Sequence, residues 1–167
     1  MDLSALDAAL ERMGWERDVP RIVAAARLAG GARGLLASLS REQAKLLQYD
    51  WRWWARPLRQ TGPREFLGQE EPPGDWTHWL IMTGAGWGKT LVGAQWVTDR
   101  AWGFPRCRIA VVGGTAKDAR EVMAFGESGI AEKAPPWFRP HLDVTNQCLE
   151  FTNRSMAATC SGVNAAL

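Results

Sequence analysis

A glycine-rich segment that ends in a lysine and a threonine is the part of the sequence best suited to chemistry. It runs Thr83-Gly84-Ala85-Gly86-Trp87-Gly88-Lys89-Thr90. Glycines let the backbone curl with its N–H groups pointing at an anion, and a helix that follows adds the positive end of its dipole. In such a loop the lysine reaches the β- and γ-phosphates, and the hydroxyl binds Mg²⁺. The segment therefore predicts a phosphate-binding loop, with Lys89 as its catalytic cation and Thr90 as its metal ligand.

The loop departs from the strict form of this motif at one position. The pattern GxxxxGK[ST] requires a glycine where this chain has Thr83. The Gly-Lys-Thr ending remains, and so does its position between an apolar run and a helical pattern, which are the parts with the clearest mechanical role. The alternative interpretation is a glycine-rich turn that happens to precede a lysine.

Hydrolysis of a nucleotide needs more than this loop. An acidic residue at the end of another buried strand holds the Mg²⁺-bound water, and a carboxylate activates the attacking water. No apolar run in the sequence ends in Asp-Glu, because residues 109–112 continue into Gly113 and Gly114. Glu150 lies in an alternating segment and is expected to face solvent. The chain is therefore expected to bind nucleotide without efficient hydrolysis.

Apolar runs and helical periodicity place the loop in an α/β fold. A short apolar run at 79–82 is typical of a buried strand in a parallel sheet, and 108–112 is a second one. Helices are expected at 91–102 and 115–125, so that strands and helices alternate. A proline- and glycine-rich surface connection at 61–75 precedes the first strand. Three β-segments are expected after the second helix, at 142–145, 149–152 and 157–160.

The N-terminal part of the sequence predicts helices. Residues 1–38 are expected to form a helical arm, with a break at 18–20 between two short helices. Ser40 and Gln43 fit a capping box, and the helix that they open is expected to continue through Trp54. The predicted domains are therefore the arm and an α/β domain over residues 39–167.

Composition limits the kind of protein. The 167 residues are 46% hydrophobic and 23% charged, enough for one ordinary domain. A formal charge of +2 excludes a protein that grips nucleic acid by charge alone. No apolar run approaches the roughly 20 residues that span a bilayer, so a cytoplasmic chain is expected. Two histidines exclude a multi-histidine metal centre, and three dispersed cysteines are expected to be buried thiols: Cys107, Cys148 and Cys160.

The order of these segments resembles the large terminase subunit of tailed bacteriophages and of phage-like gene transfer agents. The resemblance runs from about residue 39 to the end. Its specific pieces are Tyr49 to Pro57, Gly74 to Ile81, Gly88 to Val97, Arg108 to Ala116, and Gly126 to Pro140. Together they are far more specific than a phosphate loop alone.

The resemblance implies a P-loop ATPase with a three-layer α/β/α parallel sheet that binds ATP and Mg²⁺. It also implies a motor that couples ATP hydrolysis to translocation of DNA into the procapsid. The implied partners are double-stranded phage DNA, a small terminase subunit and the portal protein, with a homo-oligomeric ring and no membrane. The implied location is the host cytoplasm, at the procapsid portal. In the family, the acidic Walker B strand, the catalytic glutamate and a nuclease domain come later than residue 167 of this sequence, so the sheet is expected to be incomplete at its C-terminal end.

The resemblance also assigns positions around the loop. The family's adenine-binding segment falls at Arg56 and Gln60, with Arg59 as an alternative for the glutamine position and a solvated helix end as the alternative for either residue. Ala85 stands where relatives have an arginine that senses the γ-phosphate, so slow hydrolysis is expected. Gln95 stands where relatives tend to carry glutamate, and the difference is interpreted as neutral surface variation.

Several interpretations stay open. For Thr115 and Lys117, one interpretation is a contact to DNA or phosphate, by analogy with motor ATPases, and the favoured one is a helix cap with an exposed lysine. The whole chain is interpreted as the ATP-binding part of a terminase, with a small P-loop phosphotransferase or an inactive prophage remnant as alternatives. A phosphotransferase would need a substrate-binding lid and an acidic partner for Mg²⁺, and the sequence indicates neither.

Overall fold

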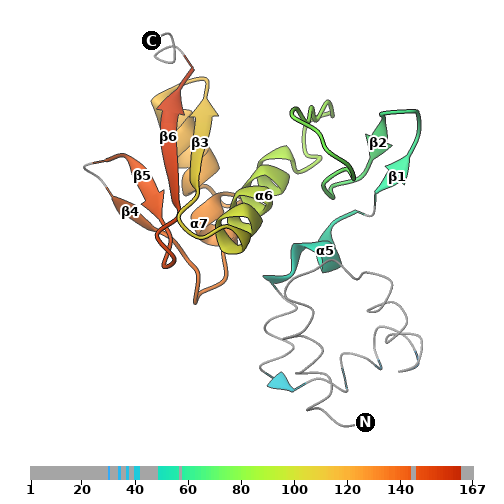
Figure 1. Ribbon diagram of the computed structural model, residues 1–167, viewed down its shortest axis with the longest axis horizontal. Coiled ribbons are helices and arrows are strands. Elements are labelled where there is room, and N and C mark those ends of the chain that lie inside the picture. The colour runs from blue at the N-terminus through green and yellow to red at the C-terminus, as the bar shows by residue number, and fades with distance from the viewer. Residues whose placement is uncertain are drawn as a thin grey trace. The chain divides into compact units, whose positions relative to one another are not determined.

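The computed structural model describes residues 30, 34, 37, 40–41, 49–56, 58–143 and 146–162. The chain divides into two units, Met1–Trp53 and Trp54–Leu167. Most of the predicted helical arm, and most of the helix predicted after Ser40, lie outside the described residues, and the domain boundary after residue 38 stays a prediction. The end of the helix predicted after Ser40 falls in the described residues, as α5 (Trp51–Trp54) (Figure 1).

The longest helix, α6 (Lys89–Gly103), begins directly after the glycine-rich segment. Its buried face carries Ala94, Val97 and Ala101, which are spaced three and four residues apart as an amphipathic helix requires. The helix ends where the backbone N–H of Phe104 donates to the Arg100 carbonyl oxygen at 3.0 Å. The helix predicted at 91–102 is therefore confirmed.

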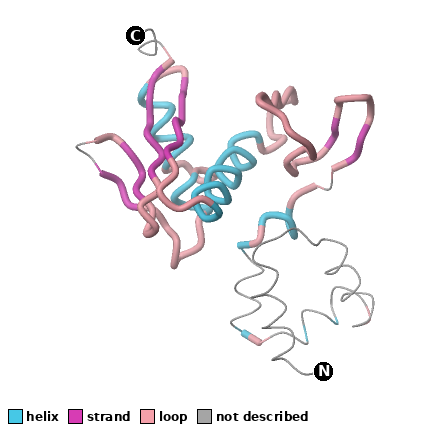
Figure 2. Tube along the Cα trace, viewed as in Figure 1, coloured by secondary structure: helices cyan, strands magenta, loops and turns pink. Residues whose placement is uncertain are grey.

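Four strands form a mixed sheet in the order β3-β6-β5-β4 (Figure 2). The strand β3 (Arg108–Gly113) runs parallel to β6 (Met156–Ser161), in register from the pair Arg108 and Met156 to the pair Gly113 and Ser161. The two remaining strands are antiparallel to their neighbours and are β4 (His141–Asp143) and β5 (Cys148–Glu150). The four β-segments predicted from residue 108 onward are therefore present with shifted ends, and residues 144–145 lie outside the described residues.

Two short helices connect β3 to β4. The helix predicted at 115–125 is present, but its central part, η1 (Asp118–Ala124), is a π-helix. The backbone N–H of Phe125 donates to the carbonyl of Arg120 at 3.0 Å, five residues back instead of four. The next helix is α7 (Ile130–Lys133). Strands and helices therefore alternate through this region, which makes the described part an α/β fold.

The hydrophobic core lies between the helices and one face of the sheet. Ala94 and Val97 of α6, Ala124 of η1 and Ile130 of α7 pack in the same cluster as Leu149 of β5. Three aromatic rings extend this cluster: the Phe138 ring lies 4.9 Å from the Phe151 ring in a stacked pair, and 4.7 Å from the Trp102 ring edge to face. On the opposite face of the sheet the side chains of Val112 and Cys160 are exposed. The described residues thus show one helical layer on the sheet, and the predicted three-layer arrangement is not confirmed.

The buried strand predicted at 79–82 is wrong for this structure. No strand is assigned there, and the side chains of Leu80 and Met82 are 78% and 81% exposed. A strand needs a neighbour that pairs with its backbone N–H and C=O groups, and no described strand pairs with this segment. Instead, the ring of Trp79 packs edge to face with that of Trp76, with ring centroids 5.8 Å apart.

The surface connection predicted at 61–75 contains part of a small hairpin. The strands β1 (Arg59–Gln60) and β2 (Phe66–Leu67) pair antiparallel. The backbone N–H of Thr61 donates to the carbonyl of Glu65 at 3.0 Å and closes the turn. The remainder of the connection has no regular secondary structure, as its composition predicts.

Two predictions of side-chain burial are wrong. Gln95 is 7% exposed and not a surface residue, because α6 packs against α7 and η1 as well as against the core, so that more than one stripe of the helix is covered. Cys160 is exposed, because β6 alternates and this residue faces away from the helices. Cys148 is buried as expected, and Cys107 is partly buried.

Among the described residues, no helix has the length and apolar character needed to cross a membrane.

The stability of the chain should depend on the buried core. Replacing Leu149 with alanine should lower the free energy of unfolding by about 2–5 kcal/mol, because a fully buried leucine leaves a cavity when truncated. The measurement is urea unfolding followed by circular dichroism. Leu67→Ala is the matched control, since that side chain is 61% exposed and its loss should change the same free energy by less than about 0.5 kcal/mol. Equal losses in the two variants would contradict the core described here.

The buried and the exposed cysteine should differ in their reactivity. Burial raises the pKa of the Cys148 thiol, and the nearby carboxylates of Asp143 and Glu150 raise it further. Less thiolate is then present at a given pH, so alkylation at pH 8 should modify Cys160 and leave Cys148 unmodified until the chain is unfolded. Mass spectrometry of peptides after timed reaction with iodoacetamide measures both sites. Equal rates at the two thiols in the folded chain would show that Cys148 is not protected.

Candidate nucleotide-binding loop

Two glycines in the predicted loop adopt backbone conformations that other residues avoid. The φ angles are 74° at Gly86 and 101° at Gly88. Side chains with a Cβ atom disfavour positive φ, so glycine is required for the chain to turn sharply at these positions. The surface from Gly84 to Gly86 is exposed, and α6 begins with the residue after Gly88. The sequence thus predicted correctly that this segment is a tight loop leading into a helix.

The lysine of the motif folds back over the loop. Its ammonium group, Lys89 Nζ, donates to the carbonyl oxygens of Thr83 at 3.0 Å and Gly84 at 2.8 Å. Thr90 follows in the first turn of α6 and is partly buried. The cation, the hydroxyl and the first helical turn therefore lie at the same end of α6. This donor set fits a triphosphate with its Mg²⁺ ion, because it offers a positive group, a hydroxyl and exposed glycine backbone together.

Thr83 occupies the position that departs from the strict motif. Its backbone carbonyl oxygen receives one of the two hydrogen bonds from Lys89. Its hydroxyl oxygen is shielded from solvent, and no hydrogen-bond partner for it is found among the residues that the structure describes. The departure therefore leaves the lysine contact intact, because that contact uses the backbone and not the side chain.

Gln69 is the residue near the loop that sequence reasoning missed. Its side chain is 7% exposed, and its Nε2 donates to the carbonyl of Trp87 at 2.8 Å. Its Oε1 accepts from the backbone N–H of Arg56 at 3.1 Å, while its own N–H donates to the Arg56 carbonyl at 2.9 Å. These partners lie 13 and 18 residues away along the chain, and hydrogen bonds to distant backbone atoms leave no spacing signal in a sequence.

The two predicted adenine-binding residues lie in different surroundings. The guanidinium of Arg56 lies over the indole ring of Trp87, 6.0 Å from the ring centroid, so it is beside the loop. Gln60 is exposed in β1, and its Nε2 donates to the carbonyl of Gly62 at 3.0 Å within the hairpin. The alternative residue, Arg59, is exposed in the same strand. Of these residues, the contacts of the structure connect Arg56 alone to the loop.

The parallel strands carry no carboxylate at their carboxyl ends within the described residues. β3 ends at Gly113 and β6 ends at Ser161. Glu150 belongs to the antiparallel strand β5, and its side chain is 38% exposed. Its carboxylate lies 3.4 Å from Nε2 of its pair partner His141, whose side chain is 70% exposed. In the same described part of the chain, no group of three or more His, Cys, Asp or Glu side chains is arranged to hold a metal ion.

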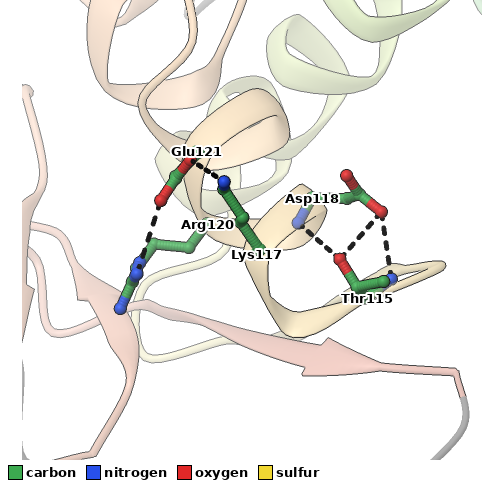
Figure 3. Close-up of polar contacts among 5 residues, drawn as sticks. All are labelled: Thr115, Lys117, Asp118, Arg120 and Glu121. Atoms are coloured by element: carbon green, nitrogen blue, oxygen red, sulfur yellow. Dashed lines mark hydrogen bonds and ion pairs between the residues drawn. The ribbon is translucent and has the colours of Figure 1, made fainter.

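Thr115 caps the helix that follows β3 (Figure 3). The Asp118 N–H donates to the Thr115 hydroxyl oxygen at 3.0 Å, while the Thr115 N–H and hydroxyl donate to the Asp118 carboxylate at 3.1 and 2.9 Å. Lys117 is exposed, and its ammonium lies 3.8 Å from the carboxylate of Glu121. The contacts agree with the favoured interpretation of a helix cap with an exposed lysine.

The fold and the loop together define an α/β protein with a glycine-rich, lysine-bearing loop at the start of its longest helix. The family model described as terminase large subunit, T4likevirus-type, N-terminal matches residues 80–166, over half of the chain. The chain therefore belongs to this family of large terminase subunits, and the resemblance seen in the sequence is confirmed. No curated protein and no solved structure gives a significant match.

The loop makes a third prediction. Gly88→Ala should lower the free energy of unfolding by about 1–2 kcal/mol, because alanine is strained at this φ and its Cβ would lie 2.9 Å from Gln69 Nε2. Gly84→Ala is the matched control, since a Cβ there meets nothing within 4 Å and φ is not positive. Thermal and urea unfolding of both variants measure the difference. A Gly88 variant as stable as the Gly84 variant would show that the loop does not hold this conformation.

Proposed function

We propose that this chain binds ATP with Mg²⁺ through the loop from Gly84 to Thr90, as the nucleotide-binding part of a DNA-packaging motor. The observation that carries the proposal is the position of Lys89, whose ammonium is held on the glycine loop at the first residue of a 15-residue helix. Membership of the large terminase subunits supports ATP as the nucleotide, with the fold proposed to be that of a P-loop ATPase with a three-layer sheet.

Each residue of the loop has a proposed role. Lys89 exchanges its carbonyl partners for the β- and γ-phosphate oxygens, since a charged acceptor is a stronger partner than a neutral carbonyl. Gly84, Gly86 and Gly88 keep the backbone close to the phosphates, and the Thr90 hydroxyl is the proposed ligand of Mg²⁺. When bound, Mg²⁺ neutralises negative charge on the phosphate oxygens. The amino end of α6 adds its dipole to the same site.

The base is proposed to bind beside Arg56. The guanidinium carbon already lies over the Trp87 ring, 6.0 Å from its centroid, and adenine offers a flat aromatic surface of the same kind. Gln60 stays a candidate for hydrogen bonds to the adenine edge, although its described contact is within the hairpin. Arg56 and the loop would thus bind opposite ends of one nucleotide.

Turnover by this chain alone is proposed to be slow. The parallel strands β3 and β6 end in Gly113 and Ser161, and neither can hold a Mg²⁺-bound water as a carboxylate does. Ala85 cannot supply a cation to the γ-phosphate. The assembled motor is proposed to translocate double-stranded DNA as a ring, together with a small terminase subunit and the portal protein, in the host cytoplasm at the procapsid portal.

The fourth prediction tests ATP binding. Lys89→Ala should abolish measurable binding of Mg-ATP, because its ammonium on the loop is the cation proposed to bind the β- and γ-phosphates. Isothermal calorimetry with purified full chain measures the affinity, and a phosphate-release assay runs beside it. Wild-type chain should bind ATP with little phosphate release.

The control for this prediction is Cys107→Ala. This side chain is partly buried, belongs to no proposed site, and lies just before β3. Its affinity for ATP should stay within a few fold of wild type. Equal binding by wild type and by the Lys89 variant would overturn the phosphate-loop proposal. Rapid steady phosphate release by wild type would show that an acidic partner lies within the 167 residues.

A further inference from the structure

The buried amide of Gln69 joins the two segments that are proposed to bind opposite ends of ATP. On one side Gln69 forms two hydrogen bonds with the backbone of Arg56: its side-chain Oε1 accepts from the Arg56 N–H at 3.1 Å, and its backbone N–H donates to the Arg56 carbonyl at 2.9 Å. On the other side its Nε2 donates to the carbonyl of Trp87 in the loop at 2.8 Å. In all three hydrogen bonds the partner atom belongs to the backbone. They therefore restrain the backbone at Arg56 and at Trp87, and not only two side chains.

The two residues after Gln69 anchor the same short segment, which we call the 69–71 strap. The Glu70 carboxylate accepts from the backbone N–H of Leu58 at 3.0 Å. The Glu71 carboxylate forms an ion pair with Arg100 in the last turn of α6, and both side chains are partly buried. The strap therefore connects the Arg56 segment, the loop and the far end of α6.

The end of the strap on α6 is well supported. The guanidinium of Arg100 lies 5.3 Å from the ring centroid of Trp96 and 5.7 Å from that of Phe104. An arginine that is held between two aromatic rings and a carboxylate loses few further conformations when the site forms. The strap is thus anchored on α6 two residues beyond Gln69.

The loop fits closely against this amide. A Cβ atom added at Gly88 would lie 2.9 Å from Gln69 Nε2, so the backbone of the loop passes the amide at a distance that only glycine permits. A buried amide is unfavourable unless its polar atoms are paired, and an apolar side chain of the same size would fill the space without that requirement. The pairing with Trp87 and Arg56 supplies what the buried amide requires.

We propose that Gln69 is a positioning residue of the nucleotide site, which holds Arg56 and the phosphate loop at the spacing at which one ATP molecule reaches both. This inference rests on the proposed function. Gln69 does not touch the nucleotide; it acts through the backbones of its two partners. A site that is held in its binding geometry before the ligand arrives binds more tightly, because less ordering is left to occur on binding.

The fifth prediction compares two ligands. Gln69→Met keeps the size of the side chain and removes the hydrogen bonds of its amide. Its affinity for Mg-ATP should fall about tenfold or more, and its affinity for Mg-tripolyphosphate should fall less, because tripolyphosphate does not use Arg56. The preference for ATP over tripolyphosphate, measured by calorimetry on the full chain, should therefore decrease. A residue that only stabilises the fold would lower both affinities by the same factor.

A double-mutant cycle tests the link between the two residues. Arg56→Ala should reduce the preference for ATP in the wild-type background and reduce it less in the Gln69→Met background, since only the backbone hydrogen bond from residue 69 then holds Arg56. Fully additive effects would overturn the proposal. Gln95→Met makes the same change at another buried glutamine, on α6, and should leave the ligand preference unchanged.

A second variant keeps the test decisive if Gln69→Met does not fold, as judged by circular dichroism. Gln69→Glu retains an acceptor for the Arg56 N–H but loses the donor to Trp87. It should lower the affinity for both ligands and retain the effect of Arg56→Ala on the preference. Loss of that effect would overturn the proposal. Wild-type chain that binds neither ligand would instead overturn the proposed function itself, which is a different result.

Discussion

The anchoring of α6 at its carboxyl end is the constraint on which the rest of the structure depends. The Ala101 carbonyl accepts a hydrogen bond from Asn153 Nδ2 at 2.6 Å, and the single proton of the Ser155 hydroxyl is shared between the Ala101 carbonyl at 3.2 Å and the Phe104 carbonyl at 3.1 Å. Ser155 is fully buried, and it lies directly before β6. The last turn of α6 is thereby joined to the sheet, where carbonyl groups at a helix end would otherwise lack partners. The opposite end of the helix is left to carry the glycine loop.

The two ends of α6 are held in place by different kinds of interaction. The carboxyl half is held by apolar packing as well as by these hydrogen bonds, with Val97 and Ala101 in the same cluster as Leu149 and Phe151. The amino end is held by polar contacts that run through Gln69 and the lysine of the loop. Apolar packing is insensitive to small charged ligands, whereas hydrogen bonds to a loop can be exchanged for bonds to a phosphate. The proposed nucleotide site at this end would therefore respond to its ligand while the sheet stays intact.

The sequence predicts those elements whose cause is local. Helix α6 follows from the spacing of its apolar residues, strand β3 from an unbroken apolar run, and the loop from its glycines. The run at 79–82 has the same apolar character as β3, yet it is not a strand, because pairing depends on a neighbour that the run itself does not specify. Gln69 was missed for a related reason: it lies in a segment with the composition of a loop, and its importance comes from backbone atoms far along the chain.

The distribution of buried apolar residues has a consequence for how the chain opens. Among the described residues, the buried apolar side chains stop at Ala55 and resume at Val92, and Gln69 is the buried residue between them. Amide hydrogens in this stretch are protected by a few polar contacts, whereas those of β3 and β6 are protected by the whole core. Hydrogen exchange in the stretch is therefore expected to proceed through local opening at a low free energy, whereas exchange in the sheet is expected to require cooperative unfolding. The predicted ligand loop would then open without loss of the sheet that supports its helix.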